Sequence, residues 1–104
     1  MKFIIFELNQ AYYALPAAQV PKVVPPVPLT PVPFVPEYVD GLVNIFGQVI
    51  PQINLALKLG LPSLLLPTQG ELLLLVLNES YYTLHVSRVI QMVEIDEHDI
   101  FPLY

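Results

Sequence analysis

Seven of the twelve prolines in this chain fall in one stretch between positions 21 and 36. They stand at positions 21, 25, 26, 28, 31, 33 and 36. A proline lacks the amide hydrogen that a helix or a central strand needs, and it keeps the residue before it extended. The stretch therefore cannot be helical, and we expect it at a sheet edge or crossing between sheets. Its interleaved Val, Leu and Phe residues are too apolar for a solvated linker, so we expect it to pack across the surface of a barrel.

The whole chain is apolar enough to form one domain, which we assign to residues 1–104. Hydrophobic residues make up 55% of the 104 residues, which rules out intrinsic disorder. The net charge is −5 and the four basic residues are scattered, so the clustered Lys and Arg that bind nucleic acids or anionic membranes are missing. The chain has no Cys, no signal-peptide pattern and no apolar run of the ~20 residues that cross a bilayer. We expect a cytoplasmic protein without membrane insertion.

Short apolar stretches separated by turn residues predict an all-β barrel or sandwich. Three hairpins are predicted, with connections at 9–11, 46–47 and 78–80. Their strands are 3–8 with 12–15, 42–45 with 48–53, and 72–77 with 81–86, and a last strand is expected at 88–95. One short helix is expected at 55–59, because Asn54 can cap its first amides and Gly60 can adopt the left-handed conformation that ends a helix.

Few residues could carry chemistry. His85 and Ser87 lie two positions apart on a predicted strand and so share a face, but a partly exposed strand face explains them better than a base and a nucleophile do. The end of the chain has side chains of the kinds that bind metals: Glu94, Asp96, His98 and Asp99. Their spacing matches no calcium loop, and we expect a solvated acidic turn. We therefore predict no catalytic residue, no metal and no cofactor.

The proline stretch also contains three P-x-x-P spacings, which are typical of peptides that dock in aromatic grooves. Such peptides usually add a flanking basic residue, and only Lys22 is near. We expect internal packing for these prolines instead. The sequence contains no phosphate-binding glycine loop and no zinc-binding helix motif, so the function that remains is a protein surface.

The order of residues from Pro33 to Pro51, PFVPEYVDGLVNIFGQVIP, resembles the CheW family of chemotaxis adaptor domains. That family typically shows a Pro-x-x-Pro turn, an aromatic–aliphatic pair, the signature Gly-Val-Ile-Asn-Leu-Arg-Gly, and a strand that leads into Pro. The likeness extends over nearly the whole chain. Residues 6–13 resemble the family's opening hairpin, 17–24 the following strand, 53–62 the short helix, and 83–95 a pair of strands.

The resemblance implies a pair of SH3-like β-barrels with one short connector helix. It also implies a non-catalytic scaffold that binds a chemoreceptor, a chemotaxis histidine kinase, or both. On the family's pattern, the candidate residues for protein interaction, or for support of it, are Val20, Val23, Asn44 and Gly47, to which we add the divergent Lys22 and Phe46. Core packing is the alternative for Val20 and Val23, and turn geometry alone is the alternative for Gly47.

Two of these candidates are departures from the family. Phe46 stands where the signature has Arg, and Lys22 stands where many members have Glu, so a characteristic charge pair cannot form. An aromatic side chain at a hairpin tip exposes apolar surface unless a partner covers it. We therefore expect a divergent member with a specialised partner.

The chain stops at Tyr104, where the family usually adds two strands and often a helix. We therefore expect a shortened second barrel without its C-terminal strands, and an unpaired edge, such as one beside residues 72–77, open to another chain. Homodimerisation or strand exchange follows as a hypothesis. Two other functions stay open: a small barrel that binds an apolar ligand near residues 64–66 and 72–77, and a domain of this fold with a different protein partner.

Overall fold

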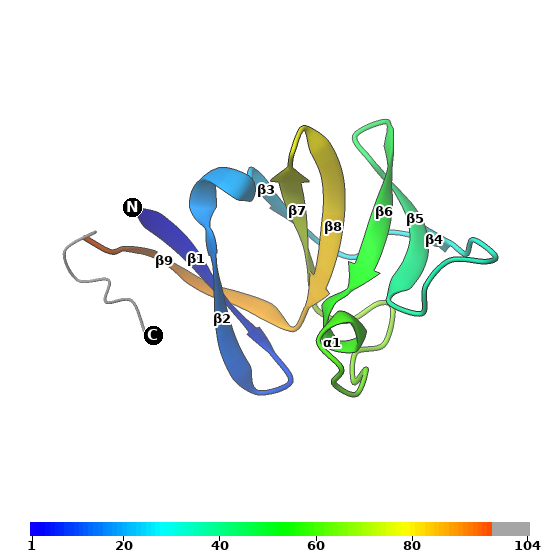
Figure 1. Cartoon of the computed structure of the whole chain (residues 1–104), viewed down its shortest axis with the longest axis horizontal. Helices are drawn as coiled ribbons and strands as arrows, with labels where there is room; N and C mark the ends of the chain where they lie inside the picture. Colours follow the sequence, from blue (N-terminus) through cyan, green and yellow to red (C-terminus); the bar gives the residue numbers. More distant parts are fainter. Residues whose placement is uncertain (97–104) are drawn as a thin grey trace.

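The computed structural model describes residues 1–96, and the strands in it form two sheets (Figure 1). The strands are β1 (Lys2–Leu8), β2 (Ala11–Pro16), β3 (Lys22–Val24), β4 (Leu29–Thr30), β5 (Val39–Ile45), β6 (Gln48–Asn54), β7 (Glu71–Leu77), β8 (Ser80–Val86) and β9 (Arg88–Glu94). Two short helices accompany them, the 3₁₀ helix η1 (Ala17–Gln19) and the α-helix α1 (Leu55–Lys58). The predicted all-β, SH3-like class with one short connector helix is confirmed. No helix among residues 1–96 is long and apolar enough to cross a bilayer.

The smaller sheet has the order β2-β1-β9 and the larger one β3-β7-β8-β6-β5-β4. All strand pairs are antiparallel except β6 and β8, which run parallel from Gln52↔Thr83 to Asn54↔His85. The chain passes from the larger sheet to the smaller one at Ser87, where the amide donates a 2.9 Å hydrogen bond to the carbonyl of Glu7. One end of the molecule is thus made by the first hairpin together with the last strand (Figure 1).

The three predicted hairpins are confirmed, and each closes with a two-residue turn. Leu8 pairs with Ala11, and Leu77 pairs with Ser80, so the third residue of two predicted connections belongs to a strand. The short helix is also confirmed, although it ends at Lys58. The amide of Leu57 donates to Asn54 Oδ1 at 3.1 Å, which caps the first turn as predicted.

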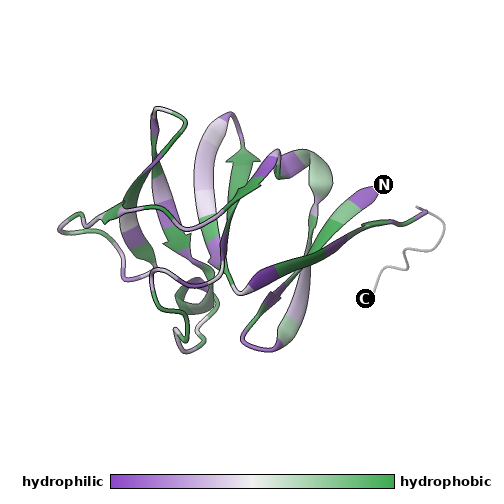
Figure 2. Ribbon diagram, turned by 180° about the vertical axis from the view of Figure 1, so that it is seen from behind, coloured by the Kyte–Doolittle hydropathy of each residue, from purple (hydrophilic) through white to green (hydrophobic). Residues whose placement is uncertain are grey.

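The proline stretch crosses the larger sheet from one edge to the other. β3 pairs with β7 at one edge and β4 pairs with β5 at the opposite edge, and only residues 25–28 separate these two strands. Four extended residues span at most about 18 Å between their flanking Cα atoms. Six flat strands would be about 24 Å across. The larger sheet must therefore curl, and the crossing lies over its near side in Figure 2, as predicted for a stretch packed across a barrel.

Two expectations about strands are wrong. Residues 17–24 are not one strand, because residues 17–19 form η1 between Pro16 and Pro21, where the amide of Val20 donates to the carbonyl of Ala17 at 3.1 Å. Residues 72–77 do not flank an unpaired edge, because β7 lies between β3 and β8. Within residues 1–96 the outer strands are β2 and β9 in one sheet and β3 and β4 in the other.

Strand β7 is buried on both faces and lies between two clusters of the core, where Figure 2 shows it in green at the middle of the molecule. The first cluster packs the smaller sheet against β7 and β8, with buried residues Ile4, Phe6, Val20, Leu73, Leu75, Leu84 and Val86. The second packs the proline crossing against β5 and β6, with buried residues Val43, Ile45, Ile50 and Leu74. The leucines 72–75 therefore fill the core, which removes them as the lining expected for an apolar ligand.

Candidate protein-interaction surface

The candidate surface is built around the turn of the β5–β6 hairpin. Ile45 pairs with Gln48, and the two residues between them have positive φ angles, 50° at Phe46 and 85° at Gly47, as in a type I′ turn. The amide of Gly47 donates a 2.9 Å hydrogen bond to Asn44 Oδ1. A Cβ atom added at Gly47 would meet nothing within 4 Å, so glycine is favoured there by its backbone angle and not by crowding. Asn44 and Gly47 thus shape the turn that carries Phe46.

Phe46 is 76% exposed at the tip of this turn, as the sequence predicts. A positive φ is unusual for a bulky residue, so the local backbone preference works against phenylalanine here. The ammonium of Lys22 lies 4.9 Å from the centroid of its ring, in a cation–π contact. Such contacts contribute about 0.5–1 kcal/mol at exposed sites. The two departures from the family's pattern therefore touch each other, and an aromatic–cation contact stands where that pattern would place a charge pair.

A hollow of about 190 Å³ lies beside the ring. It is lined by Val24, Pro25, Val27, Asn44, Ile45 and Phe46. Val24 and Val27 also pack on the second core cluster, so the proline crossing forms one wall of the hollow and β5 forms another. The sequence patterns do not point to these valines as site residues. Their interleaving with prolines is the one sequence feature that could have indicated a fixed position for them. We call Lys22, Asn44, Phe46, Gly47 and this hollow the Phe46 surface.

Val20 and Val23 do not belong to the Phe46 surface. Side chains alternate along a strand, so Val23 points to the opposite face of β3 from Lys22. Val23 is 39% exposed there, whereas Val20 is 8% exposed and lies in the first core cluster. The structure therefore brings together four of the six predicted residues, namely Lys22, Asn44, Phe46 and Gly47.

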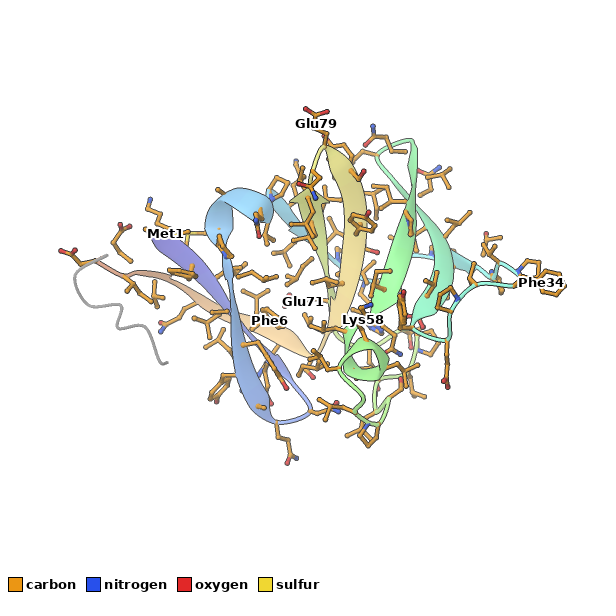
Figure 3. All side chains as sticks on the ribbon, viewed as in Figure 1. Met1, Phe6, Phe34, Lys58, Glu71 and Glu79 are labelled. Carbon is orange, nitrogen blue, oxygen red and sulfur yellow. The ribbon has the colours of Figure 1, made fainter. Side chains whose placement is uncertain are left out.

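Two further exposed apolar features were not predicted. Phe34 projects from the tip of the loop between β4 and β5 and has a φ of 62° (Figure 3). An open cleft of about 480 Å³ lies between the first halves of β6 and β8, before the residues at which these two strands pair. The exposed Val49 and Tyr81 are in its lining. The cleft begins at Gln48, directly after the Phe46 turn.

The residues considered for catalysis have structural contacts instead. His85 is only 5% exposed, so the expectation of a partly exposed strand face is wrong for His85, whereas Ser87 is half-buried. Its Nε2 lies 2.6 Å from the carbonyl oxygen of Gln69, in the loop that follows α1 and covers this part of β8. Ser87 uses its amide to join the two sheets. His85 therefore ties the loop to the larger sheet.

Only part of the acidic group that we expect to form a solvated turn lies within the described residues, because His98 and Asp99 lie outside them. Glu94 Oε1 accepts a hydrogen bond from the N-terminal ammonium at 3.0 Å, which ties the end of β9 to the start of β1. Among residues 1–96 no three His, Asp or Glu side chains are grouped as metal ligands. Elsewhere on the smaller sheet, a hydrogen bond to Glu7 raises the pKa of Arg88 above its usual value.

Comparisons with known proteins agree with this architecture. The family model described as CheW-like domain matches residues 2–104. The chain is 31% identical over 103 residues to the chemotaxis protein CheW of Helicobacter pylori, covering 99% of this chain and 62% of that protein. It is 24% identical to the chemotaxis protein CheW of Treponema pallidum, covering 95% and 61%. The crystal structure of the scaffolding protein TtCheW from Thermoanaerobacter tengcongensis superposes with a TM-score of 0.88 at 28% identity, covering 99% of this chain and 67% of that one. The chain thus spans about three fifths of the length of the curated relatives that it matches.

Proposed function

The chain belongs to the family of CheW-like domains, and from that membership we propose that it is a non-catalytic scaffold in a chemotaxis-type signalling system of the cytoplasm. Its partners in this proposal are a chemotaxis histidine kinase, a chemoreceptor, or both. The two similar proteins of Helicobacter pylori and Treponema pallidum are chemotaxis proteins, and the similar solved structure is that of a scaffolding protein.

The observation that carries the proposal is the exposed ring of Phe46. A bulky side chain at 76% exposure and with positive φ gains little from its own chain, because most of its surface stays in water. Aromatic residues held on rigid elements are typical anchors of protein interfaces. A scaffold needs such a surface, whereas an enzyme needs convergent polar groups.

A divergent domain of this fold with a partner outside chemotaxis is the second candidate function. Phe46 and Lys22 favour it, because both depart from the family's charged pattern at the same place and contact each other there. A partner selected for this aromatic surface would differ in chemistry from one selected for an arginine and a glutamate.

Titration calorimetry of the 104-residue protein against the regulatory domain of a chemotaxis histidine kinase from the same organism tests the proposal. A Phe46→Arg variant is titrated beside the wild type. Micromolar binding by the wild type is the expected result. If only the variant binds, the fold has been kept while its surface has been retuned to another partner, and the second candidate function is favoured.

Self-association is a separate part of the proposal. The outer strands β2, β9, β3 and β4 have a side that pairs with no strand among residues 1–96, and such edges pair readily with a second chain. We therefore keep the homodimer or strand-exchanged pair as a prediction. Light scattering that returns a monomer near 12 kDa at high concentration would contradict it.

A further inference from the structure

The geometry of the Phe46 surface points to the chemistry of what it binds. We propose that the hollow takes one bulky apolar side chain of a partner protein, and that a carboxylate close to that side chain pairs with Lys22. This inference rests on the proposed function and specifies the segment that the partner brings to the surface.

The volume of the hollow selects a side chain over a small molecule. It holds about 190 Å³, whereas pockets for small-molecule ligands are usually ~300–1,000 Å³ and a water molecule takes up ~30 Å³. A single Leu, Met or Phe side chain is of the right order to fill it. Interface anchors of this kind, seated in pockets that exclude water, supply most of the binding free energy in many complexes.

The walls of the hollow select an apolar occupant. Five of its six lining residues are apolar, and the sixth, Asn44, uses its side-chain oxygen for the hydrogen bond from Gly47. A polar group buried here would leave hydrogen bonds unmade, which is costly. Pro25 and the neighbouring prolines also hold one wall rigid, so this wall loses little conformational entropy when a partner side chain enters.

Lys22 selects the charge beside the anchor. Its ammonium lies over the Phe46 ring, and the two recorded salt bridges, of Arg88 with Glu7 and of the N-terminus with Glu94, do not involve it. An ammonium has three hydrogen-bond donors, so contact with one ring face leaves donors for a partner. A carboxylate that arrives next to the apolar anchor gains a hydrogen-bonded ion pair, whereas a basic group at the same place is repelled.

The test measures binding of the kinase regulatory domain by calorimetry for the wild type and four variants, and of a chemoreceptor signalling domain in its place if the wild type does not bind the kinase domain. Phe46→Ala is expected to weaken binding about 30-fold or more, as loss of a hot-spot residue does. Val27→Phe narrows the hollow without changing Phe46 or Lys22 and is expected to weaken binding at least about tenfold. Lys22→Gln is expected to cost about 2–5-fold and to reduce the salt dependence of the dissociation constant. Tyr12→Ala, at an exposed aromatic residue of the other sheet, is the matched control and is expected to bind like the wild type.

Circular dichroism and thermal melting check that each variant is folded. If Val27→Phe does not fold, the result for Phe46→Ala decides the test. If the wild type binds while Phe46→Ala stays within twofold of it, the inference is overturned and the proposed function stands. If Lys22→Gln binds more tightly than the wild type, the partner is not acidic at this place, and the part of the inference that assigns it a carboxylate is overturned. If the wild type binds neither the kinase domain nor a chemoreceptor signalling domain, the proposed function fails, and this inference fails with it.

Discussion

The three hairpins of this fold close with the same backbone geometry and differ in what they place at their tips. The turns of β1–β2 and β7–β8 are Asn9–Gln10 and Asn78–Glu79, each with φ angles of 50° and 66°. The turn of β5–β6 has 50° and 85° at Phe46–Gly47. Asparagine tolerates the first of these positions because its short polar side chain suits the left-handed region, whereas phenylalanine gains nothing there.

This difference between the tip residues distinguishes the hairpins that serve the stability of the fold from the one whose tip is the candidate for partner contact. The hairpins with polar tips are held by their strands, above all by β7, where Leu72 and Leu73 are fully buried. In the β5–β6 hairpin, Gly47 and the Asn44 hydrogen bond support a turn whose first residue is locally unfavourable. Under the proposed function, this turn keeps an exposed aromatic ring against its own backbone preference because the ring contacts the partner in a complex.

The largest effect on stability is expected from a substitution in a hairpin strand and not from one at a hairpin tip. Leu74 is 8% exposed in the second core cluster, so Leu74→Asp places an unpaired carboxylate in the core. We expect a loss of at least about 3–5 kcal/mol, which leaves no cooperative unfolding transition by circular dichroism. Leu64→Asp, at a residue 66% exposed, is the control and should melt close to the wild type. A folded Leu74→Asp protein would show that β7 is not the central strand.

The next effect compares the glycines near the two ends of β5. A Cβ atom at Gly41 would lie 2.3 Å from the carbonyl oxygen of Thr30, so alanine there must push β4 away in addition to adopting a φ of 148°. At Gly47 only the backbone angle opposes alanine. We expect Gly41→Ala to cost roughly 2–3 kcal/mol and Gly47→Ala about 1 kcal/mol in urea unfolding. Equal losses would mean that the close approach of β4 to β5 is not maintained in solution.

Local features of this chain could be predicted from the sequence, and contacts across the sheets could not. The hairpins and the Asn54 cap depend on residues within a few positions of each other, so turn residues and apolar patterns suffice to place them. The parallel pairing of β6 with β8 depends on how the larger sheet curls, which no short stretch encodes.

The candidate site follows the same division. Phe46 was predicted to be exposed because it stands in a turn, which is a local property. Its contact with Lys22 joins residues on different strands and exists only because the proline crossing brings β3 next to the β5–β6 turn. The burial of His85 could not be predicted for the same reason, since the loop that buries it lies next to it only in the folded chain.

Exchanging the tip residues tests the comparison directly. Asn78→Phe gives the β7–β8 turn the residue that β5–β6 has, at the same φ of 50°. We expect it to cost about 1 kcal/mol, seen as a lower melting temperature. Phe46→Asn relieves the same backbone penalty but loses the Lys22 contact, worth about 0.5–1 kcal/mol, so its stability should change less. If Phe46→Asn is the more destabilised of the two, the ring of Phe46 stabilises the fold and the separation argued above is wrong.

The smallest effect on stability is expected at Asn44, whose side chain supports the turn that carries Phe46. Asn44→Ala removes the exposed 2.9 Å hydrogen bond from Gly47, and such bonds contribute about 0.5–1 kcal/mol net. Asn44→Asp keeps the acceptor oxygen and is the matched control, so it should unfold at nearly the wild-type urea concentration. Equal losses in both variants would show that this hydrogen bond does not shape the turn. In that case Asn44 would no longer count among the residues that hold Phe46 in place.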